Sequence, residues 1–348
     1  MNYLKLLQLI YKEKIIGGNQ MKKKLLSALC AGIISVLMLG CGKSNNVDVT
    51  TEEKVTINLG LTKAAPALPV LQMAETNAMG DNVELNIDYW DSPEQLIAMS
   101  QDGKHDIFAL PLTVGAKLYN KGIGIKLTNV DTWGITYFVT SDESIKDWSD
   151  LRGKTIYVPL KSSPPDIVLR YFLNSNGINP DSDVELKYAS TSEVAQLAKA
   201  GQAEYAVLLE PQVTNCISGN ENLRIAFSYD TEWKKIMGED KNIPNAGIGA
   251  STDFIDKNPE MMKKFEEEYK EALNYLIENP DKAGELGEKY FGVNKEIMEK
   301  AMPTLGIMYK DGKESIEDLN EFYKVLYDFD PSTIGGKIPD EEFYYSPE

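Results

Sequence analysis

Short runs of alternating apolar and polar residues fill residues 54–110, and segments with apolar residues at helical spacing separate them. In residues 54–61, Val55, Ile57 and Leu59 fall on one face, as in a half-buried strand. The pattern predicts strands at 54–61, 83–90 and 105–110, and helices at 64–79, 93–101 and 112–119. Strands that alternate with helices at this spacing predict βαβ units and a mainly parallel sheet.

The same pattern restarts after Asp142 and then becomes purely helical. Strands are predicted at 155–158, 184–188, 205–209 and 223–228, and helices at 164–176 and 191–200. From Asn258 onward, Met262, Phe265 and Tyr269 begin an apolar stripe at helical spacing. Further helices are predicted at 280–290, 295–302 and 315–327. The chain therefore has the pattern of two α/β units followed by helices.

The N-terminal pattern is that of a targeting segment. Three lysines at 22–24 precede an uncharged, mostly apolar run at 25–39, which is shorter than the roughly 20 residues of a membrane span. Met38-Leu39-Gly40-Cys41 resembles a bacterial lipobox, so we expect a lipoprotein signal peptide at 21–40 and a lipid on Cys41. An ordinary signal peptide or a short membrane anchor is the alternative. Residues 1–20 are expected to be a misassigned extension before a true start at Met21, and residues 41–53 a flexible tether.

The charge and composition of the chain limit the classes of molecule that it can bind. Six lysines and one glutamate lie in residues 1–40, so the remainder carries a net charge of −22. Such acidity argues against nucleic acid and against direct adhesion to anionic lipid. His105 is the single histidine, which disfavours histidine metal sites and histidine-based catalysis. Cys216 is left without a disulfide partner and is expected to be a small, partly buried residue.

Several motifs in the second unit resemble one family of proteins. They are Asp-Leu-Arg-Gly-Lys at 150–154, a serine-containing loop that opens a helix at 161–166, Ala-x-Ala-Gly at 198–201, and Glu210-Pro211. In this order they resemble the solute-binding lipoproteins of nitrate/sulfonate/taurine-type ABC importers, which share a fold with thiamine-pyrimidine-binding proteins. The resemblance implies an α/β, two-lobed, periplasmic-binding-protein-like (type II) fold with a ligand cleft. Lobe one would comprise 54–140 and 246–348, and lobe two 141–245, with crossings near 139–142 and 245–250.

Residues at the ends of predicted strands are the candidates for this cleft, because open α/β sheets bind ligands there. They are Thr62, Lys63, Pro111, Leu112, Thr113, Thr132, Trp133, Lys161, Ser162, Ser163, Glu210 and Asn245. Each has a structural alternative. Thr62 and Lys63 fit a solvated turn, Thr113 a helix cap, and Trp133 core packing that would replace a stacking wall. Glu210 fits either a ligand acceptor or an ion pair with a lysine.

The stretch Lys161-Ser-Ser-Pro-Pro-Asp166 combines two signals. Ser163 as N-cap and Asp166 three residues later predict a capping box, with Pro164 at the first helical position. The paired prolines lack N–H groups, and Asp166 already places negative charge at the helix start, so tight anion binding is disfavoured. Lys161, Ser162 and the amides before the prolines remain available to a ligand.

The expected function is the extracytoplasmic, lipid-anchored solute-binding component of an ABC importer, without catalysis, cofactor or metal. Its partners would be a small-molecule ligand, the permease subunits and, through the anchor, the membrane; we expect a monomer. The alternatives are a pyrimidine-synthase-like enzyme on the same fold, which the single histidine disfavours, and a ligand-sensing receptor. The ligand is expected to be small, planar or partly apolar, and neutral, zwitterionic or cationic.

Overall fold

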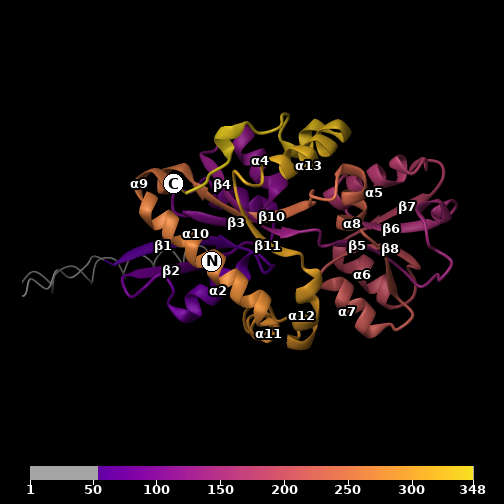
Figure 1. Cartoon of the computed structure of the whole chain (residues 1–348), viewed down its shortest axis with the longest axis horizontal. Helices are drawn as coiled ribbons and strands as arrows, with labels where there is room; N and C mark the ends of the chain where they lie inside the picture. The colour runs from indigo at the N-terminus through magenta and orange to yellow at the C-terminus, as the bar shows by residue number, and fades with distance from the viewer. Residues whose placement is uncertain (1–53, 348) are drawn as a thin grey trace, which may run out of the picture. The chain divides into compact units, whose positions relative to one another are not determined.

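The computed structural model describes residues 54–347. The expected N-terminal extension, the signal peptide, the lipidated Cys41 and the tether therefore lie outside the described residues. The described residues form two β-sheets with their flanking helices (Figure 1).

The first sheet has six strands in the order β11-β4-β10-β3-β1-β2. They are β1 (Val55–Leu61), β2 (Val83–Tyr89), β3 (Ile107–Pro111), β4 (Ile125–Trp133), β10 (Pro244–Ser251) and β11 (Ile307–Asp311). Its helices are α2 (Ala67–Thr76), α3 (Pro93–Met99), α4 (Leu112–Asn120), α9 (Thr252–Lys257), α10 (Pro259–Glu278), α11 (Pro280–Leu286), α12 (Lys295–Ala301) and α13 (Ile316–Phe329). Short helical turns are η2 (Gly287–Phe291), η3 (Met302–Thr304), η4 (Pro331–Ile334) and η5 (Glu341–Phe343). We call this sheet with its helices the first lobe.

Both faces of the first sheet are covered, which explains why the central strand β3 is apolar throughout. In β3, Ile107 and Ala109 pack on the side of α2 and α10, whereas Phe108 and Leu110 belong to the core on the side of α4 and α13. A strand buried on both faces has no polar alternation. The continuous apolar run at 107–110 in the sequence reflects this burial of β3 on both faces.

The second sheet has five strands in the order β7-β6-β8-β5-β9. They are β5 (Thr136–Thr140), β6 (Thr155–Pro159), β7 (Glu185–Ala189), β8 (Tyr205–Leu209) and β9 (Arg224–Ser228). Its helices are η1 (Trp148–Leu151), α5 (Pro164–Ser175), α6 (Thr191–Lys199), α7 (Gln212–Gly219) and α8 (Tyr229–Met237). Cys216 is buried here against α6, with its thiol 3.2 Å from the Ala195 carbonyl. We call this sheet with its helices the second lobe.

The prediction of a mainly parallel sheet is wrong, because both sheets are mixed. β1 pairs parallel with β2 and β3, but β10 runs antiparallel to β3 and β4, and β11 antiparallel to β4. In the second sheet, β6 is parallel to β7 and β8, but β5 is antiparallel to β8 and β9. The antiparallel strands β5 and β10 begin where the chain arrives from the other sheet, so no crossover helix sets their direction.

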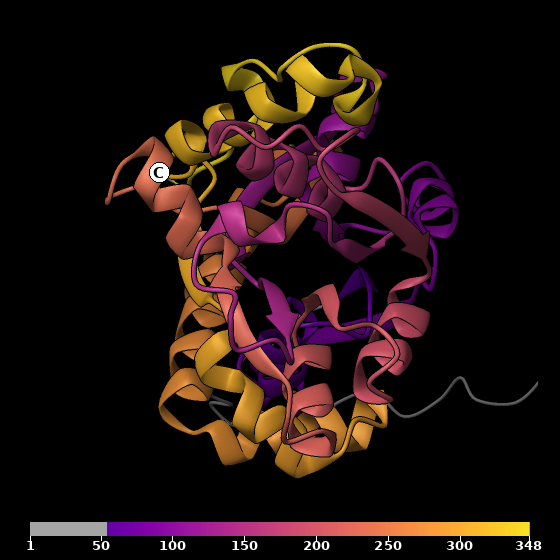
Figure 2. The same ribbon diagram turned by 90° about the vertical axis from the view of Figure 1, so that its right-hand side faces the viewer.

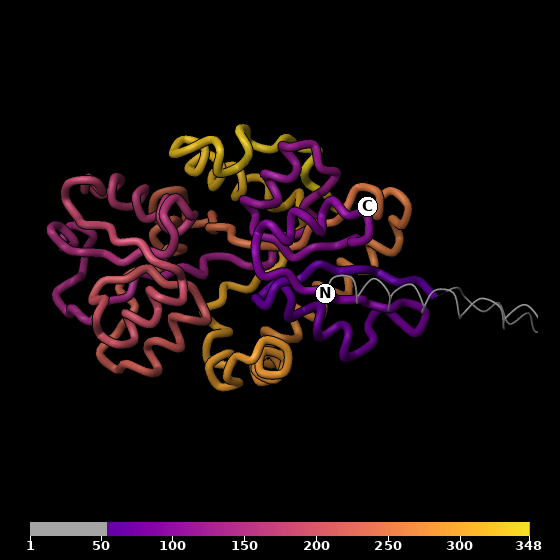
Figure 3. The backbone as a smooth tube through the Cα atoms, turned by 180° about the vertical axis from the view of Figure 1, so that it is seen from behind, coloured from indigo at the N-terminus to yellow at the C-terminus, as the bar shows by residue number. Residues whose placement is uncertain are grey.

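The chain passes between the two sheets at points that differ from the predicted crossings. The first passage is at residues 134–135, because β5 already belongs to the second sheet. The return lies at residues 238–243, because β10 pairs within the first sheet. Figure 3 follows the backbone through both passages. The predicted ranges 139–142 and 245–250 therefore lie largely inside strands; the assignment of whole lobes by residue range stays a prediction.

Helices of the C-terminal part contact the second lobe on two opposite sides. α13 packs against α5, and its Phe322 ring lies 6.4 Å from the Trp233 ring of α8, whereas α12 packs against α7. Figure 2 shows α13 in yellow on one side of the second lobe and the orange helices on the other. Among residues 54–347, no helix has the length and apolar character needed to cross a bilayer.

Candidate functional site

A cavity of about 290 Å³ is lined by residues of both lobes, and we call it the large cavity. The first lobe contributes the loop between β1 and α2, the end of β4, the start of β10 and the segment from η2 to β11. The second lobe contributes the start of α6 and the turn between β8 and α7. Its lining consists of Lys63, Ala64, Ala65, Pro66, Thr132, Ile135, Thr191, Leu209, Glu210, Pro211, Gln212, Asn245, Ala246, Phe291, Val293, Met298 and Leu305. A mainly apolar wall with a few polar groups is typical of small-molecule sites.

Four of the twelve predicted site residues line the large cavity: Lys63, Thr132, Glu210 and Asn245. The eight others are absent from its lining: Thr62, Pro111, Leu112, Thr113, Trp133, Lys161, Ser162 and Ser163. Strand ends of both sheets therefore do meet at one cavity, but only part of each predicted loop reaches it.

Trp133 and Thr113 are two of the predicted residues that do not line the large cavity. The Trp133 ring is 3% exposed, its Nε1 donates to the Met308 carbonyl at 2.7 Å, and the Lys310 ammonium lies 4.9 Å from the ring centroid. These contacts are the core packing that was the alternative to a stacking wall. Thr113 does not cap α4, whose N-cap is Pro111 and makes no side-chain cap bond.

Glu210 is the most densely bonded acidic group of the cavity. It is 6% exposed, and its Oε1 accepts from the hydroxyls of Thr304 at 2.6 Å and Thr214 at 2.9 Å. Its Oε2 accepts from the Thr214 amide at 3.0 Å. No lysine or arginine is paired with Glu210 within residues 54–347, so the predicted ion pair is not formed.

Thr304 joins this carboxylate to the first lobe. The Tyr137 hydroxyl, from β5, donates to the Thr304 carbonyl at 2.8 Å, so both polar groups of Thr304 are bonded to the second lobe. Burial raises the pKa of Tyr137 to about 12, which keeps its hydroxyl a donor at neutral pH. Glu210, Tyr137 and Thr304 thus form a polar bridge between the lobes at the cavity.

A second acceptor of the cavity has no donor. The Gln212 side-chain oxygen is buried from solvent and has no hydrogen-bond partner in the structure. A buried carbonyl without a donor costs about 1–3 kcal/mol. The cavity lining thus contains two buried side-chain acceptors, in Glu210 and Gln212, beside side chains that can donate, such as Lys63.

The loop that enters α5 differs from the predicted capping box. Ser163 is the N-cap residue, but its hydroxyl donates to the Pro159 carbonyl at 2.8 Å and makes no cap bond. Asp166 accepts from the Ser162 amide at 2.8 Å, one residue before the position that a capping box requires. Leu160 and Ser162 both have positive φ, 51° and 62°, and the Ser163 amide donates to the Leu160 carbonyl at 3.1 Å.

Asp166 is fully buried and has two further partners. Arg170 donates through Nε to its Oδ1 at 3.2 Å, and the Tyr188 hydroxyl donates to the same oxygen at 3.1 Å. Its charge is therefore used within the second lobe. The carboxylate anchors the loop and is not directed at a ligand.

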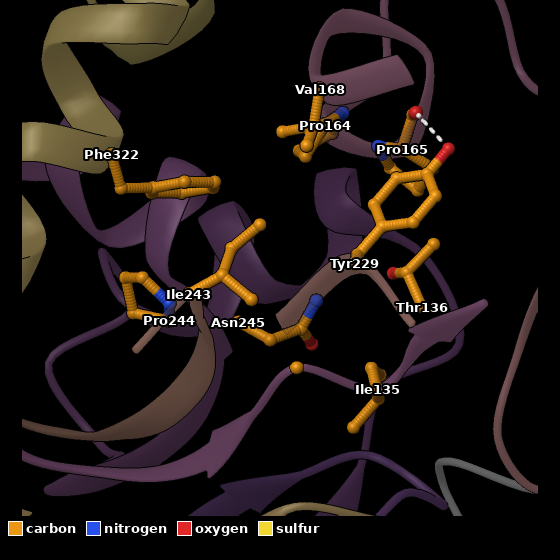
Figure 4. Close-up of a pocket in the computed structure, with 11 residues that line it drawn as sticks. Ile135, Thr136, Pro164, Pro165, Val168, Tyr229, Ile243, Pro244, Asn245 and Phe322 are labelled. Carbon is orange, nitrogen blue, oxygen red and sulfur yellow. Dashed lines mark hydrogen bonds between the residues drawn. The ribbon is translucent and has the colours of Figure 1, made fainter. Parts of the chain in front are cut away.

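A second, small cavity of about 20 Å³ lies beside the large one (Figure 4). Ile135 and Asn245 line both cavities, and Pro164, Pro165, Tyr229 and others complete the small one. The Tyr229 hydroxyl donates to the Pro165 carbonyl at 3.2 Å, and this bond is the dashed line in Figure 4. A space of this size holds about one water molecule, so it is not a ligand site.

Four of the thirteen cavity residues that sequence reasoning missed come from the segment 291–305. Phe291, Val293, Met298 and Leu305 read as ordinary apolar positions of helices, and no motif marks them. Leu209 and Gln212 could have been predicted from the sequence, because they lie within two residues of Glu210. Thr191 also had a signal, since it follows a predicted strand and begins a predicted helix.

No group of three or more metal-ligating side chains is placed to hold a metal ion within the described part of the chain. His105 lies outside both cavities, with its two ring nitrogens 2.9 Å from Asp102 and 3.1 Å from Asp88. The lining of the large cavity therefore offers both acceptor and donor side chains, and it contains no histidine.

Sequence comparison matches residues 120–283 to the family model "NMT1/THI5 like". A protein of Brucella abortus named as a binding protein is 25% identical over 174 residues, which are 50% of this chain and 52% of that protein. The riboflavin-binding protein RibY of Chloroflexus aurantiacus is 22% identical over 214 residues, 56% of this chain and 57% of that protein. The matched region thus spans about half the length of these curated relatives.

Solved structures with the same fold cover most of the chain. An ABC transporter protein of Parabacteroides distasonis superposes with a TM-score of 0.73 at 22% identity, over 85% of this chain and 100% of that chain. The aliphatic sulphonate-binding protein SsuA of Escherichia coli gives 0.69 at 13% identity, over 84% and 92% of the two chains. Residues 120–283 are therefore similar to the NMT1/THI5-like family, and the described chain has the two-lobed fold of periplasmic solute-binding proteins.

Proposed function

We propose that this protein is the solute-binding component of an ABC importer, which captures a small molecule in the large cavity and delivers it to a permease. The observation that carries this proposal is a cavity lined from both lobes, at strand ends, in a fold shared with proteins of such importers. Closure of two lobes around a ligand is a known route to a docking surface that differs between empty and loaded states.

The ligand that suits this cavity donates hydrogen bonds at one end and is apolar elsewhere. Glu210 and Gln212 offer acceptor oxygens, and no cation is paired with the Glu210 carboxylate. A buried carboxylate is stabilised by an opposite charge or by donors. Lys63, at the exposed edge, can meet an anionic group, so a zwitterion also fits. Similar proteins named for sulphonate, nitrate and riboflavin define the compounds to compare with amines.

Membrane attachment is a further part of the proposal and concerns residues outside the described range. We propose that Cys41 carries a lipid that holds the protein at the outer face of the cytoplasmic membrane. The protein would act there as a monomer, without catalysing a reaction. Radiolabelled palmitate incorporation that is lost in Cys41→Ser is the expected result, and incorporation that persists in this variant would contradict the anchor.

A thermal-shift screen tests the ligand assignment. The compounds are alkylsulfonates, taurine, nitrate, riboflavin, aminopyrimidines and thiamine-like amines, and a bound compound raises the melting temperature. We expect the largest rise with an amine-bearing, partly apolar compound, and a loss of affinity of about tenfold or more in Glu210→Gln. Glu285→Gln, an exposed carboxylate on α11, is the matched control and should bind normally. Stabilisation by alkylsulfonates alone, unchanged in Glu210→Gln, would reject the assignment.

A further inference from the structure

A buried carboxyl lies directly beneath the wall of the large cavity. Asp131, on β4, is 1% exposed, and its neighbour Thr132 lines the cavity. Tyr269, on α10, is fully buried and lies between Asp131 and Pro66, which also lines the cavity just before α2. The carboxyl is thus connected to the cavity wall at two points, through Thr132 and through Tyr269 to Pro66.

The number of protons available for the hydrogen bonds among Pro66, Tyr269 and Asp131 indicates whether the Asp131 carboxyl is protonated. The Tyr269 oxygen lies 2.9 Å from the Pro66 carbonyl oxygen and 2.6 Å from Asp131 Oδ2. A phenol has one proton and can donate to only one of these acceptors. If Tyr269 donates to Pro66, the contact with Oδ2 is attractive only when the carboxyl carries a proton and donates to the phenol. The other carboxyl oxygen, Oδ1, accepts from the Thr132 hydroxyl at 2.5 Å.

The surroundings of Asp131 favour the neutral form. Burial, with a smaller contribution from Glu266 in the same direction, raises the pKa of Asp131 to about 7 and outweighs the hydrogen bonds of Thr132 and Tyr269, which lower it. Glu266 and Tyr269 face it from α10, and Tyr309 of β11 donates to Glu266 at 2.8 Å. Lys310, also on β11, is paired with Asp318, and no lysine or arginine of the described residues is paired with Asp131. α2 presents only the Pro66 carbonyl, and the cavity-lining residues of β10 are Asn245 and Ala246, which do not titrate.

We propose that Asp131 is a positioning residue of the large cavity, which in its protonated form holds Pro66 in place through Tyr269 and releases it when the proton is lost. This inference rests on the proposed function only in taking the large cavity as the ligand site. Above neutral pH the ionised carboxylate competes for the single Tyr269 proton, so the bond from Tyr269 to Pro66 breaks. The loop between β1 and α2 then loses its attachment to α10.

Amide hydrogen exchange of the unliganded protein tests the proposal without any ligand. The Ala67 and Leu68 amides, bonded to the Ala64 and Ala65 carbonyls at 3.0 Å, report on this loop. After correction for intrinsic rates, we expect their protection to fall about tenfold between pH 6 and pH 8.5. In Asp131→Asn, whose amide can donate to Tyr269 and accept from Thr132, protection should stay within twofold. The Val194 amide, in α6 of the second lobe, serves as an unaffected reference.

Two further measurements keep the test decisive if Asp131→Asn does not fold. The carboxyl carbon of Asp131, followed by NMR in the wild-type protein, should titrate near pH 7. Tyr269→Phe should lower the protection of Ala67 and Leu68 at every pH, whereas Glu266→Gln should retain the pH step. A titration midpoint below pH 5, or a pH step in Asp131→Asn equal to that of the wild type, would overturn the proposal. Neither result depends on which solute the protein binds.

Discussion

A single buried carboxylate, Asp166, holds together the loop that opens α5. Three donors converge on it: the Ser162 amide, Arg170 Nε and the Tyr188 hydroxyl. A buried charge with several well-placed donors is stable, whereas the loss of the charge leaves those donors unpaired. The side chain therefore matters more for the position of the loop than for the start of the helix.

Replacing Asp166 by alanine should destabilise the protein by about 3 kcal/mol, because Arg170 loses its buried partner and two further donors are left without an acceptor. Equilibrium unfolding in urea measures the change. Asp181→Asn is the matched control, since Asp181 also pairs with Arg170 but its side chain is 75% exposed. Exposed pairs contribute at most about 1 kcal/mol. Equal effects of the two substitutions would contradict the role of burial.

At the level of elements, the segment between β6 and α5 is the most strained part of the second lobe. Leu160 is 56% exposed and has a φ of 51°, in the left-handed region that leucine rarely adopts. Its side chain makes little compensating contact. The strain lies next to the two prolines that line the small cavity.

Leu160→Gly should therefore stabilise the protein by about 0.5 kcal/mol, as relief of the left-handed conformation outweighs the added freedom of the unfolded chain. Chemical denaturation provides the measurement. Asn77→Gly, at the left-handed C-cap of α2, is the control and should give no gain, because asparagine tolerates this conformation and Asn77 also donates to Asp81. A loss of stability in Leu160→Gly would show that its exposed side chain forms a necessary contact.

Strands and helices with a clear hydrophobic period in the sequence were predictable. Strands whose position depends on pairing with residues distant in the sequence were not. The alternation in 54–61 and 83–90 and the capped helix at 93–101 reappear as β1, β2 and α3. β10 and β11 escaped prediction, because residues such as Gly247 and Gly249 carry no apolar signal. Gly247 is nevertheless required, since a Cβ there would lie 2.1 Å from the Asn129 carbonyl oxygen of the adjacent strand. The cavity was predictable only where its residues follow local strand ends, as at Glu210, and not in the segment 291–305.

At the scale of the whole molecule, the two lobes are joined by more than the two chain passages. Glu210 and Tyr137 of the second lobe bond to Thr304 of the first, and this polar bridge borders the large cavity. On the opposite side α13 contacts α5, and its Phe322 ring packs against Trp233 of α8. The polar side is therefore the one at which a ligand can compete for the bridging groups.

Thr304→Val should weaken the polar bridge and shift the unliganded protein toward a more open arrangement. We expect an increased radius of gyration in small-angle X-ray scattering and a lower melting temperature, because Glu210 loses a charge-assisted bond of about 1.5–3 kcal/mol. Thr333→Val is the matched control, since the Thr333 hydroxyl donates only to carbonyls within the first lobe. Identical scattering of the wild type and Thr304→Val would exclude a bridge that restrains the lobes.

Asp131 also links pH to the stability of the whole fold. Its pKa is raised from 3.8 to about 7 by burial, so its contribution to stability is fully present below about pH 4 and is lost as the pH rises through 7. The difference in unfolding free energy between the wild type and Asp131→Asn should therefore change by about 4 kcal/mol over this window, in favour of the variant. Urea unfolding at pH 4 and pH 8 measures it. A constant difference would mean that Asp131 is ionised throughout.

The packing of Trp233 against Phe322 gives the protein an internal optical marker. All four tryptophans, at positions 90, 133, 148 and 233, are at most 6% exposed, so the emission of the folded chain comes entirely from indoles in apolar surroundings. Trp233 alone has its ring against an aromatic ring of the other lobe. Separation of α8 from α13 would bring water to this indole while the other three stay covered. A red shift in the emission of Trp233 alone, one of the four tryptophans, would therefore distinguish movement between the lobes from unfolding of either lobe.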